Sequence, residues 1–113
     1  MKTYCLTLDL QDDPALIEEY KRHHRNVWPE VLKSIHDAGI ANARIYLLGN
    51  RLVMTLEVTD DFTFEAKAAA DAANSRVQKW ETLMWNYQKP LPLAKPGEKW
   101  LLMEKIWDLT AAP

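Results

Sequence analysis

The sequence has few of the residues that mark several classes of protein. Its 113 residues include one cysteine, Cys5, and only three glycines and six prolines. A single cysteine cannot form an internal disulfide, so we expect a protein of a reducing compartment, the cytoplasm. The low glycine and proline content excludes collagen-like and low-complexity sequences. No apolar run approaches the roughly 20 residues that cross a membrane, and the apolar residues after Lys2 are interrupted too early for a signal peptide.

The sequence also lacks a strong excess of charge of either sign. Fourteen Lys and Arg stand against sixteen Asp and Glu, which gives a formal net charge of −2 at pH 7. This mildly acidic balance argues against a protein that binds nucleic acid or an anionic membrane, because both require a basic surface. With 48% hydrophobic residues the chain can build a core of its own. We therefore expect residues 1–113 to form a single domain.

The first part of the chain predicts a strand followed by a helix. Residues 3–10 alternate between apolar and polar, which predicts a strand whose apolar face consists of Tyr4, Leu6, Leu8 and Leu10. Asp13 and Pro14 form a helix start, with Asp13 as the N-cap. We expect the helix to run to about residue 38, with a kink at Pro29 and an end at Gly39. Its predicted core stripe is Leu16, Tyr20, Val27, Val31 and Ile35.

The second part predicts a hairpin, a broken helix and a last strand. Residues 43–48 and 51–58 are β-prone runs joined by Gly49-Asn50, which is typical of a tight antiparallel hairpin. A helical region over about 62–87 is expected to break near Asn74 and to restart at Ser75, because Ser75 and Gln78 have capping-box spacing. Its predicted core face is Val77, Trp80, Met84 and Tyr87.

The end of the chain predicts a loop and a strand. Residues 88–99 contain three prolines and a glycine and are expected to form a loop. Residues 100–109 then predict a strand that is apolar on both faces. The element order is that of an α+β fold, the ferredoxin-like split βαβ (βαββαβ), with helices on one face of an antiparallel sheet. Since helices can cover only one face of the last strand, we expect a homodimer joined sheet to sheet, as in a dimeric α/β barrel.

One helix face carries the residues with the clearest chemical potential. His23, His24 and His36 share no metal-ligand spacing with Cys, Asp or Glu, so no metal site is expected. Tyr20, His24 and Trp28 follow one another at intervals of four along one side of the predicted helix. A histidine in such surroundings is either a hydrogen-bonded core residue or a pocket acid–base group, and spacing alone favours the core residue.

Five tryptophans and two strand glutamates complete the candidates. Periodicity places Trp80 in the core, whereas the others, Trp28 among them, can line a pocket, because flat apolar rings suit sugars. Glu57 and Glu104 alternate with apolar residues, so each is either a rim residue in water or a carboxylate that binds hydroxyl groups. The sequence contains no phosphate-binding loop, nucleophile elbow or catalytic Cys–His signature.

The segment from Glu19 to His24, followed by Val27-Trp28-Pro29-Glu30, resembles the N-terminal helix of the L-rhamnose mutarotase family. The similarity continues almost to the end of the chain, through Gly39, Asn42, Ile45-Tyr46-Leu47, Glu57, Gln78-Lys79-Trp80, Met84 and Glu104. Members of this family are dimeric ferredoxin-like isomerases that interconvert the α and β anomers of a free sugar without a cofactor. The resemblance therefore implies a sugar isomerase that needs no cofactor and acts on a monosaccharide.

The resemblance also implies roles for individual residues. The family's proposed general acid falls on His24, its substrate-binding tyrosine on Tyr20, and the first residue of its Trp-Trp pair on Trp80. The second tryptophan of the pair is Glu81 here, and a tyrosine of the rhamnose pattern is Ala43. Together with Tyr20 and Trp80, the expected sugar contacts are Trp28, Tyr46, Glu57, Glu81 and Glu104.

Residues 64–71, 84–85 and 94–100 look like the branch of this family assigned to L-fucose. L-Fucose and L-rhamnose are both 6-deoxy-L-hexoses and differ in configuration at C2 and C4. A pocket in which a carboxylate replaces an aromatic side chain suits a sugar whose hydroxyl group points in a different direction. A buried polar partner discriminates strongly between two such sugars. L-Fucose is the expected substrate and L-rhamnose the alternative. From the residues alone, a haem-binding monooxygenase of the same dimeric fold and a non-enzymatic sugar-binding dimer stay open.

Overall fold

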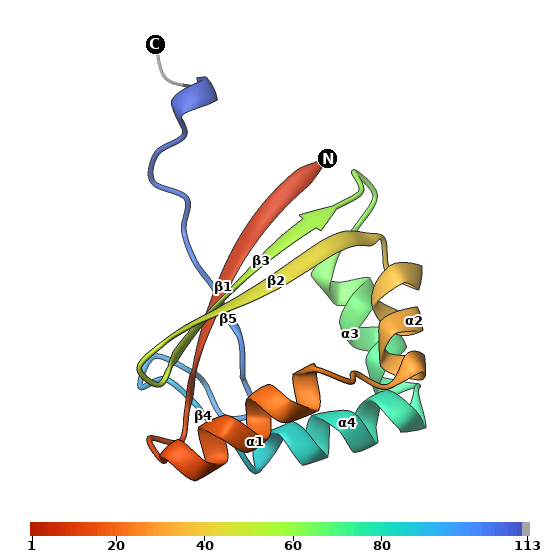
Figure 1. The fold of residues 1–113 in the computed structure, drawn as a ribbon. Helices are drawn as coiled ribbons and strands as arrows, with labels where there is room; N and C mark the ends of the chain where they lie inside the picture. Colours follow the sequence, from red (N-terminus) through yellow and green to blue (C-terminus); the bar gives the residue numbers. More distant parts are fainter. Residues whose placement is uncertain (112–113) are drawn as a thin grey trace.

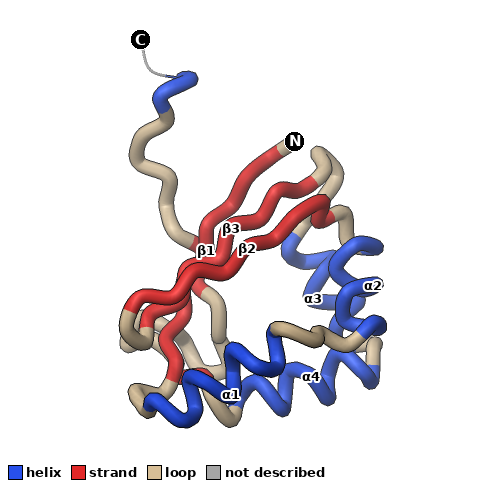
Figure 2. Tube along the Cα trace, in the orientation of Figure 1, coloured by secondary structure: helices blue, strands red, loops and turns tan. Residues whose placement is uncertain are grey.

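The computed structural model describes residues 1–111. Its elements are, in order, β1 (Lys2–Leu10), α1 (Pro14–His24), α2 (Pro29–Asp37), β2 (Ile40–Leu48), β3 (Arg51–Val58), α3 (Phe64–Ala72), α4 (Ser75–Trp85), β4 (Gln88–Lys89), β5 (Leu101–Leu102) and a 3₁₀ turn (Leu109–Ala111). The strand order is β2-β3-β1-β4, with β5 also paired to β1, and the pairs are antiparallel. The helices lie on one side of this sheet (Figures 1 and 2). The predicted α+β architecture is confirmed.

The core lies between the sheet and the helices. Leu6, Leu8 and Leu10 of β1 are buried, whereas the residues between them are only partly buried, as the alternation predicts. The predicted core face of the second helical region, Val77, Trp80, Met84 and Tyr87, is buried as well. Among residues 1–111, no helix combines the length and the apolar character needed to cross a membrane.

The first helical region is divided rather than kinked. The sequence predicts one helix to about residue 38, but α1 ends at His24 and α2 begins at Pro29. Pro29 has no backbone N–H to donate, and it forces the preceding residue out of the helical conformation. Trp28 accordingly has φ −59° and ψ 137°. The chain turns over residues 25–28, so that α1 and α2 run in different directions (Figure 1).

The start of α4 is capped differently from the prediction. The helix begins at Ser75, as expected, but its N-cap is Asn74. The Asn74 Oδ1 accepts hydrogen bonds from the backbone N–H groups of Arg76 and Val77, at 3.1 and 3.2 Å. An asparagine side chain is at least as good an N-cap as serine. The predicted capping box of Ser75 and Gln78 is therefore wrong, because Asn74 caps the helix, whereas the predicted start of the helix at Ser75 is correct.

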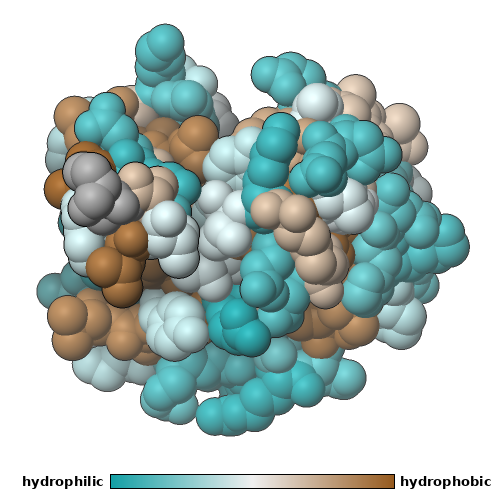
Figure 3. Space-filling model, turned by 90° about the horizontal axis from the view of Figure 1, so that it is seen from above, coloured by the Kyte–Doolittle hydropathy of each residue, from teal (hydrophilic) through white to brown (hydrophobic). Residues whose placement is uncertain are grey.

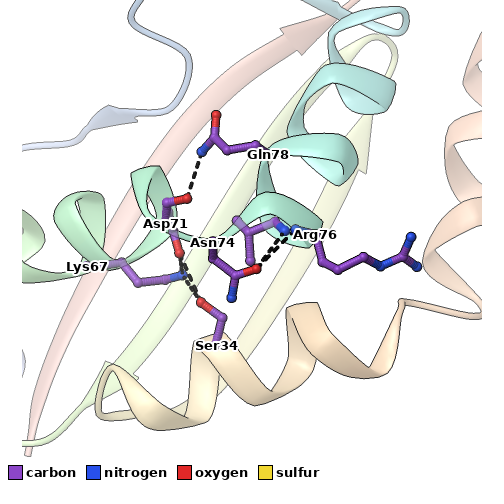
Figure 4. Close-up of polar contacts among 7 residues, drawn as sticks. Ser34, Lys67, Asp71, Asn74, Arg76 and Gln78 are labelled. Carbon is purple, nitrogen blue, oxygen red and sulfur yellow. Dashed lines mark hydrogen bonds and ion pairs between the residues drawn. The ribbon is translucent and has the colours of Figure 1, made fainter.

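A polar network joins α2, α3 and α4 (Figure 4). The carboxylate of Asp71 accepts hydrogen bonds from Ser34 at 2.9 Å and from Lys67 at 2.6 Å. Gln78 donates its side-chain amide to the Asp71 carbonyl at 2.8 Å. The bonds to Ser34 and Gln78 join α3, which has no fully buried residue, to α2 and α4, beside the packing of Phe64 against Tyr4.

The last strand is much shorter than predicted. Only Leu101 and Leu102 pair with β1, and Met103 N–H donates to the Cys5 carbonyl. The chain then leaves the sheet and extends away from the body (Figure 1). Continued antiparallel pairing would bring Ile106 opposite Lys2, at the exposed start of β1. The prediction of a strand over 100–109 is therefore wrong beyond residue 102, and we call residues 103–109 the C-terminal arm.

Gly39, which follows α2, is required by both backbone conformation and space. Its φ is +94°, and a Cβ there would lie 2.5 Å from the Thr59 Oγ1. We expect Gly39→Ala to lower the free energy of unfolding by about 1–3 kcal/mol, measured by urea unfolding. Gly97→Ala is the matched control and should cost less, because Gly97 has φ +86° but open space around it. Equal losses in the two variants would contradict a role for the Thr59 contact.

Candidate functional site

A pocket of about 270 Å³ opens between α1 and the sheet. The helix side is polar and consists of Tyr20, Lys21, His24 and Arg25, whereas the sheet side is apolar and consists of Ile45, Leu47 and Leu52. Because β2 is the edge strand, the pocket lies at the margin of the sheet. One polar and one apolar wall suit a small ring that carries hydroxyl groups on one side and carbon-bound hydrogens on the other.

A larger hollow of about 420 Å³ lies between α2 and α3. Its charged groups are already paired, Lys67 with Asp71, Lys33 with Asp37 and Glu30 with Arg76. It contains no histidine, and it holds none of the predicted site residues. Nor can any group of three or more His, Cys, Asp or Glu within residues 1–111 hold a metal ion. We therefore place the candidate site at the α1 pocket.

His24 lines this pocket, and one of its two ring nitrogens is already hydrogen-bonded. Its Nδ1 is 3.0 Å from the Tyr20 carbonyl, which can only accept, so Nδ1 carries a proton. The Nε2 forms no hydrogen bond within the described residues and is an acceptor when the ring is neutral. Burial lowers the pKa of His24 below its ordinary 6.5; the Tyr20 carbonyl opposes this shift, and the neighbouring His23 adds to it. His24 is therefore a mainly neutral imidazole at pH 7.

Tyr20 precedes His24 by one helical turn, and the two rings lie 4.4 Å apart. Burial raises the pKa of the Tyr20 phenol to about 12, and the side-chain amide of Gln88 beside it lowers this pKa only in part. The phenol therefore keeps its proton at physiological pH. It can hold a ligand by hydrogen bonds, but it does not act as a base.

Trp80 is the centre of an aromatic cluster behind the pocket. Its ring lies 5.6 Å from that of His24 and 5.2 Å from that of Trp28, in both cases edge to face. The guanidinium of Arg76 lies 4.2 Å from the Trp28 ring centre, on the outside of the cluster. Trp80 and Trp28 do not line the pocket. Trp80 is a core residue, as its periodicity predicts, and it packs against the acid–base candidate.

Glu81, expected to contact the sugar, is engaged elsewhere. Its carboxylate pairs with Lys99 at 3.1 Å, and the same ammonium lies 4.6 Å from the Trp85 ring centre. Both contacts join α4 to the predicted loop of residues 88–99. In this structure Glu81 therefore fastens the loop to the helix.

The remaining predicted site residues also lie outside the pocket. Glu57 alternates with buried residues of β3, faces away from the helices, and lies 3.9 Å from Arg44. Tyr46 is exposed on β2, although its neighbours on either side line the pocket. Glu104 is exposed on the C-terminal arm. The structure thus brings together His24 and Tyr20 but not the other expected contacts.

Sequence reasoning missed two residues near the site. Gln88 is 4% exposed, and its Oε1 has no hydrogen-bond partner among the described residues. Its amide lies beside the phenol of Tyr20, although its surroundings in the sequence indicate only a loop. His23 Nε2 lies 3.1 Å from the Tyr87 hydroxyl and joins α1 to the turn that follows α4. No local pattern could reveal either contact, because each spans more than 60 residues.

Comparisons with known proteins agree over nearly the whole chain. The family model described as L-rhamnose mutarotase matches residues 3–109. An L-fucose mutarotase of Xanthomonas campestris pv. campestris is 50% identical over 114 residues, which cover 99% of this chain and 91% of that protein. An L-rhamnose mutarotase of Klebsiella pneumoniae is 30% identical over 97 residues, 84% of this chain and 86% of that protein.

A solved structure extends the agreement to the fold. The L-rhamnose mutarotase from Formosa agariphila has a TM-score of 0.71 and 21% identity, covering 96% of this chain and 99% of that one. The matched range of the family model includes the whole α1 pocket. The relatives and the solved structure named here are mutarotases, not haem-binding monooxygenases. The chain belongs to the L-rhamnose mutarotase family.

Proposed function

We propose that this protein is a mutarotase that interconverts the α and β anomers of a free 6-deoxy-L-hexopyranose, with L-fucose as the preferred sugar. Membership of the family supports a carbohydrate isomerase. The observation that carries the proposal is a neutral His24 with a free Nε2 in a pocket of about 270 Å³. The preference for L-fucose is supported by the 50% identity to a relative of that name, against 30% to an L-rhamnose mutarotase.

Mutarotation requires only proton transfers and one reversible bond cleavage. The anomeric hydroxyl loses a proton, the ring oxygen gains one, and the bond between C1 and the ring oxygen breaks to give the open-chain aldehyde. Rotation about the C1–C2 bond and closure on the other face give the second anomer. The step balances without an oxidant and without a covalent bond to the protein.

His24 is the proposed acid–base group. Its neutral Nε2 accepts the proton of the anomeric hydroxyl, and the resulting imidazolium donates a proton to the ring oxygen. Because burial lowers the pKa of His24, the imidazolium is a strong donor and the ring returns to its neutral state. The hydrogen bond from Nδ1 to the Tyr20 carbonyl is compatible with both states, so it holds the ring in one orientation throughout.

Tyr20 is proposed to hold a sugar hydroxyl, because its phenol stays protonated at neutral pH. The apolar wall formed by Ile45, Leu47 and Leu52 suits the methyl group and the apolar face of a 6-deoxy sugar. The expected sugar contacts of Trp28, Tyr46, Glu57, Trp80, Glu81 and Glu104 stay predictions.

We further propose a cytoplasmic homodimer that acts on a free monosaccharide and has no nucleic-acid or membrane partner. Exposed apolar side chains support a partner subunit, and most of the large ones lie on β2 and on the C-terminal arm. Such a concentration is uncommon on the surface of a monomer. The single cysteine supports a reducing compartment.

Proton exchange spectroscopy tests the function directly. With a catalytic amount of protein in equilibrated L-fucose, saturation of one anomeric proton should reduce the signal of the other faster than in a protein-free sample. L-Rhamnose at the same concentration should exchange more slowly. Faster exchange with L-rhamnose would reverse the choice of sugar. Binding of either sugar without any acceleration would overturn the proposal in favour of a non-enzymatic sugar-binding dimer.

A further inference from the structure

Gln88 of β4 is a polar side chain buried beside the core. It is 4% exposed, and its Oε1 is shielded from solvent and has no hydrogen-bond partner within residues 1–111. A buried acceptor without a partner destabilises a fold, whereas an apolar side chain of the same length would not. Such a group is expected where a functional requirement opposes stability.

The register of the sheet places Gln88 on the same face as Tyr20. Gln88 pairs with Leu10 of β1, and directly opposed residues of an antiparallel pair point to the same face. Leu10 belongs to the same core cluster as Tyr20. The backbone on either side is held by Gln11, whose N–H donates to the Tyr87 carbonyl at 2.7 Å and whose side-chain amide donates to the Gln88 carbonyl at 3.2 Å. β4 therefore holds Gln88 in a fixed position.

This position belongs to the pocket end of the molecule. Figure 3 looks down on the opposite end, where the N-terminus and the C-terminal arm lie and where apolar residues, in brown, gather on the surface. β4 and α1 both lie at the other end (Figure 1). Gln88 is thus far from that apolar surface and close to the helix that carries the candidate site.

The two orientations of the Gln88 amide would have opposite effects on the Tyr20 hydroxyl. With Oε1 toward the phenol, the amide would accept the phenol O–H and take this donor away from the pocket. In the structure Oε1 has no partner among the described residues, so the phenol does not donate to it. The amide instead lowers the pKa of the phenol in part, as an N–H beside the phenol oxygen does.

We propose that Gln88 is a positioning residue that keeps the Tyr20 hydroxyl available as a hydrogen-bond donor to the sugar. With the amide N–H at the phenol oxygen, the O–H is left for the pocket that Tyr20 lines. The rings of Tyr20 and His24 lie 4.4 Å apart, so the sugar oxygen held by Tyr20 is near the oxygen that exchanges a proton with His24. This role rests on the proposed function, in which Tyr20 holds the sugar.

Gln88 acts through Tyr20, because it does not itself line the pocket. Its loss should therefore weaken the binding of the sugar without disturbing the proton transfers at His24. In kinetic measurements such a change raises KM and leaves kcat nearly unchanged. A residue that only supported the core would not produce this separation of the two constants.

A double-mutant cycle tests the role. Gln88→Met replaces the amide with an apolar side chain of similar length, and the dissociation constant of L-fucose, measured by isothermal titration calorimetry, should rise about 3–10-fold, the usual contribution of one neutral hydrogen bond. In the Tyr20→Phe background the same replacement should have no further effect, because no hydroxyl is left to position. Lys89→Met is the matched control: Lys89 is exposed on the other face of β4, so this variant should bind like the wild type.

Urea unfolding separates this role from a structural one. Gln88→Met should unfold at the wild-type urea concentration or a higher one, because it removes the unpaired Oε1. A marked fall of this midpoint, or failure of both Gln88→Met and Gln88→Leu to fold, would overturn the inference, because the amide would then be required by the core. Unchanged or tighter binding of L-fucose by Gln88→Met would also overturn it, and so would an equal rise of the dissociation constant in the two backgrounds.

The failure of the proposed function can be told apart from the failure of this inference. If the wild type binds L-fucose without accelerating its anomer exchange, the proposed function fails, and the cycle of dissociation constants still decides the role of Gln88. If the wild type accelerates the exchange and the cycle shows no coupling, only the inference fails. A wild type that binds no L-fucose would overturn both.

Discussion

Replacing His24 with alanine should slow the protein-dependent anomer exchange of L-fucose by about 10²–10⁴-fold, the usual contribution of a positioned acid–base group. His24 is the only histidine in the pocket, and its Nε2 is free to exchange protons. The chain should stay folded, because His24 is only partly buried and its ring bonds to Tyr20 within the same helix. Proton exchange spectroscopy measures the rate, and circular dichroism measures the fold.

His36→Ala is the matched control for this variant. His36 is exposed on α2, outside the pocket, so its removal should leave the rate unchanged.

The wild-type pH profile provides a second check. Since the pKa of His24 is lowered from 6.5, the neutral, proton-accepting ring persists from neutral pH down to 6.5, and the acceleration should fall only at more acidic pH. If His24→Ala keeps the wild-type rate, His24 takes no part in the mechanism.

Replacing Trp80 with alanine should lower the free energy of unfolding by about 3–5 kcal/mol. The ring is buried and packs edge to face against His24 and Trp28, so its loss leaves a cavity that the surrounding helices cannot close. The total free energy of unfolding of a domain of this size is roughly 5–15 kcal/mol, so the loss is a large fraction of it. Urea unfolding monitored by circular dichroism measures it.

Trp85→Ala is the matched control, because it removes the same ring from the same helix. Trp85 is 37% exposed, against 7% for Trp80, and its main described contact is with the ammonium of Lys99. Such a contact contributes about 0.5–1 kcal/mol at an exposed site, so this variant should unfold close to the wild type. Equal losses in the two variants would contradict the central place of Trp80 in the core.

The parts of the fold that depend on near neighbours could be predicted from the sequence. The alternation in β1 identifies its buried face, because successive strand residues point to opposite sides. The Asp13 N-cap and the turn at Gly49-Asn50 are local in the same sense and are confirmed. The pairing of Tyr20 with His24 is equally local, since one helical turn brings the two rings together.

The contacts between distant elements could not be predicted in this way. The pocket exists because α1 lies across from Ile45 and Leu47, more than twenty residues along the chain. The pairing of Glu81 with Lys99 depends on how the loop after β4 folds back on α4. Family resemblance indicates which residues carry the chemistry, whereas only packing decides which of them meet.

The end of the chain shows the same division most clearly. Alternating apolar residues after residue 100 indicate an extended segment, and the segment is extended. Its length as a strand was decided by the sheet, because pairing beyond Cys5 would place Ile106 and Trp107 at the exposed start of β1. Local sequence is thus enough to predict the strand and helix periods, the Asp13 N-cap and the neighbourhood of His24. Tertiary structure decided the pocket and the free arm, since these depend on surfaces that meet only after the chain has folded.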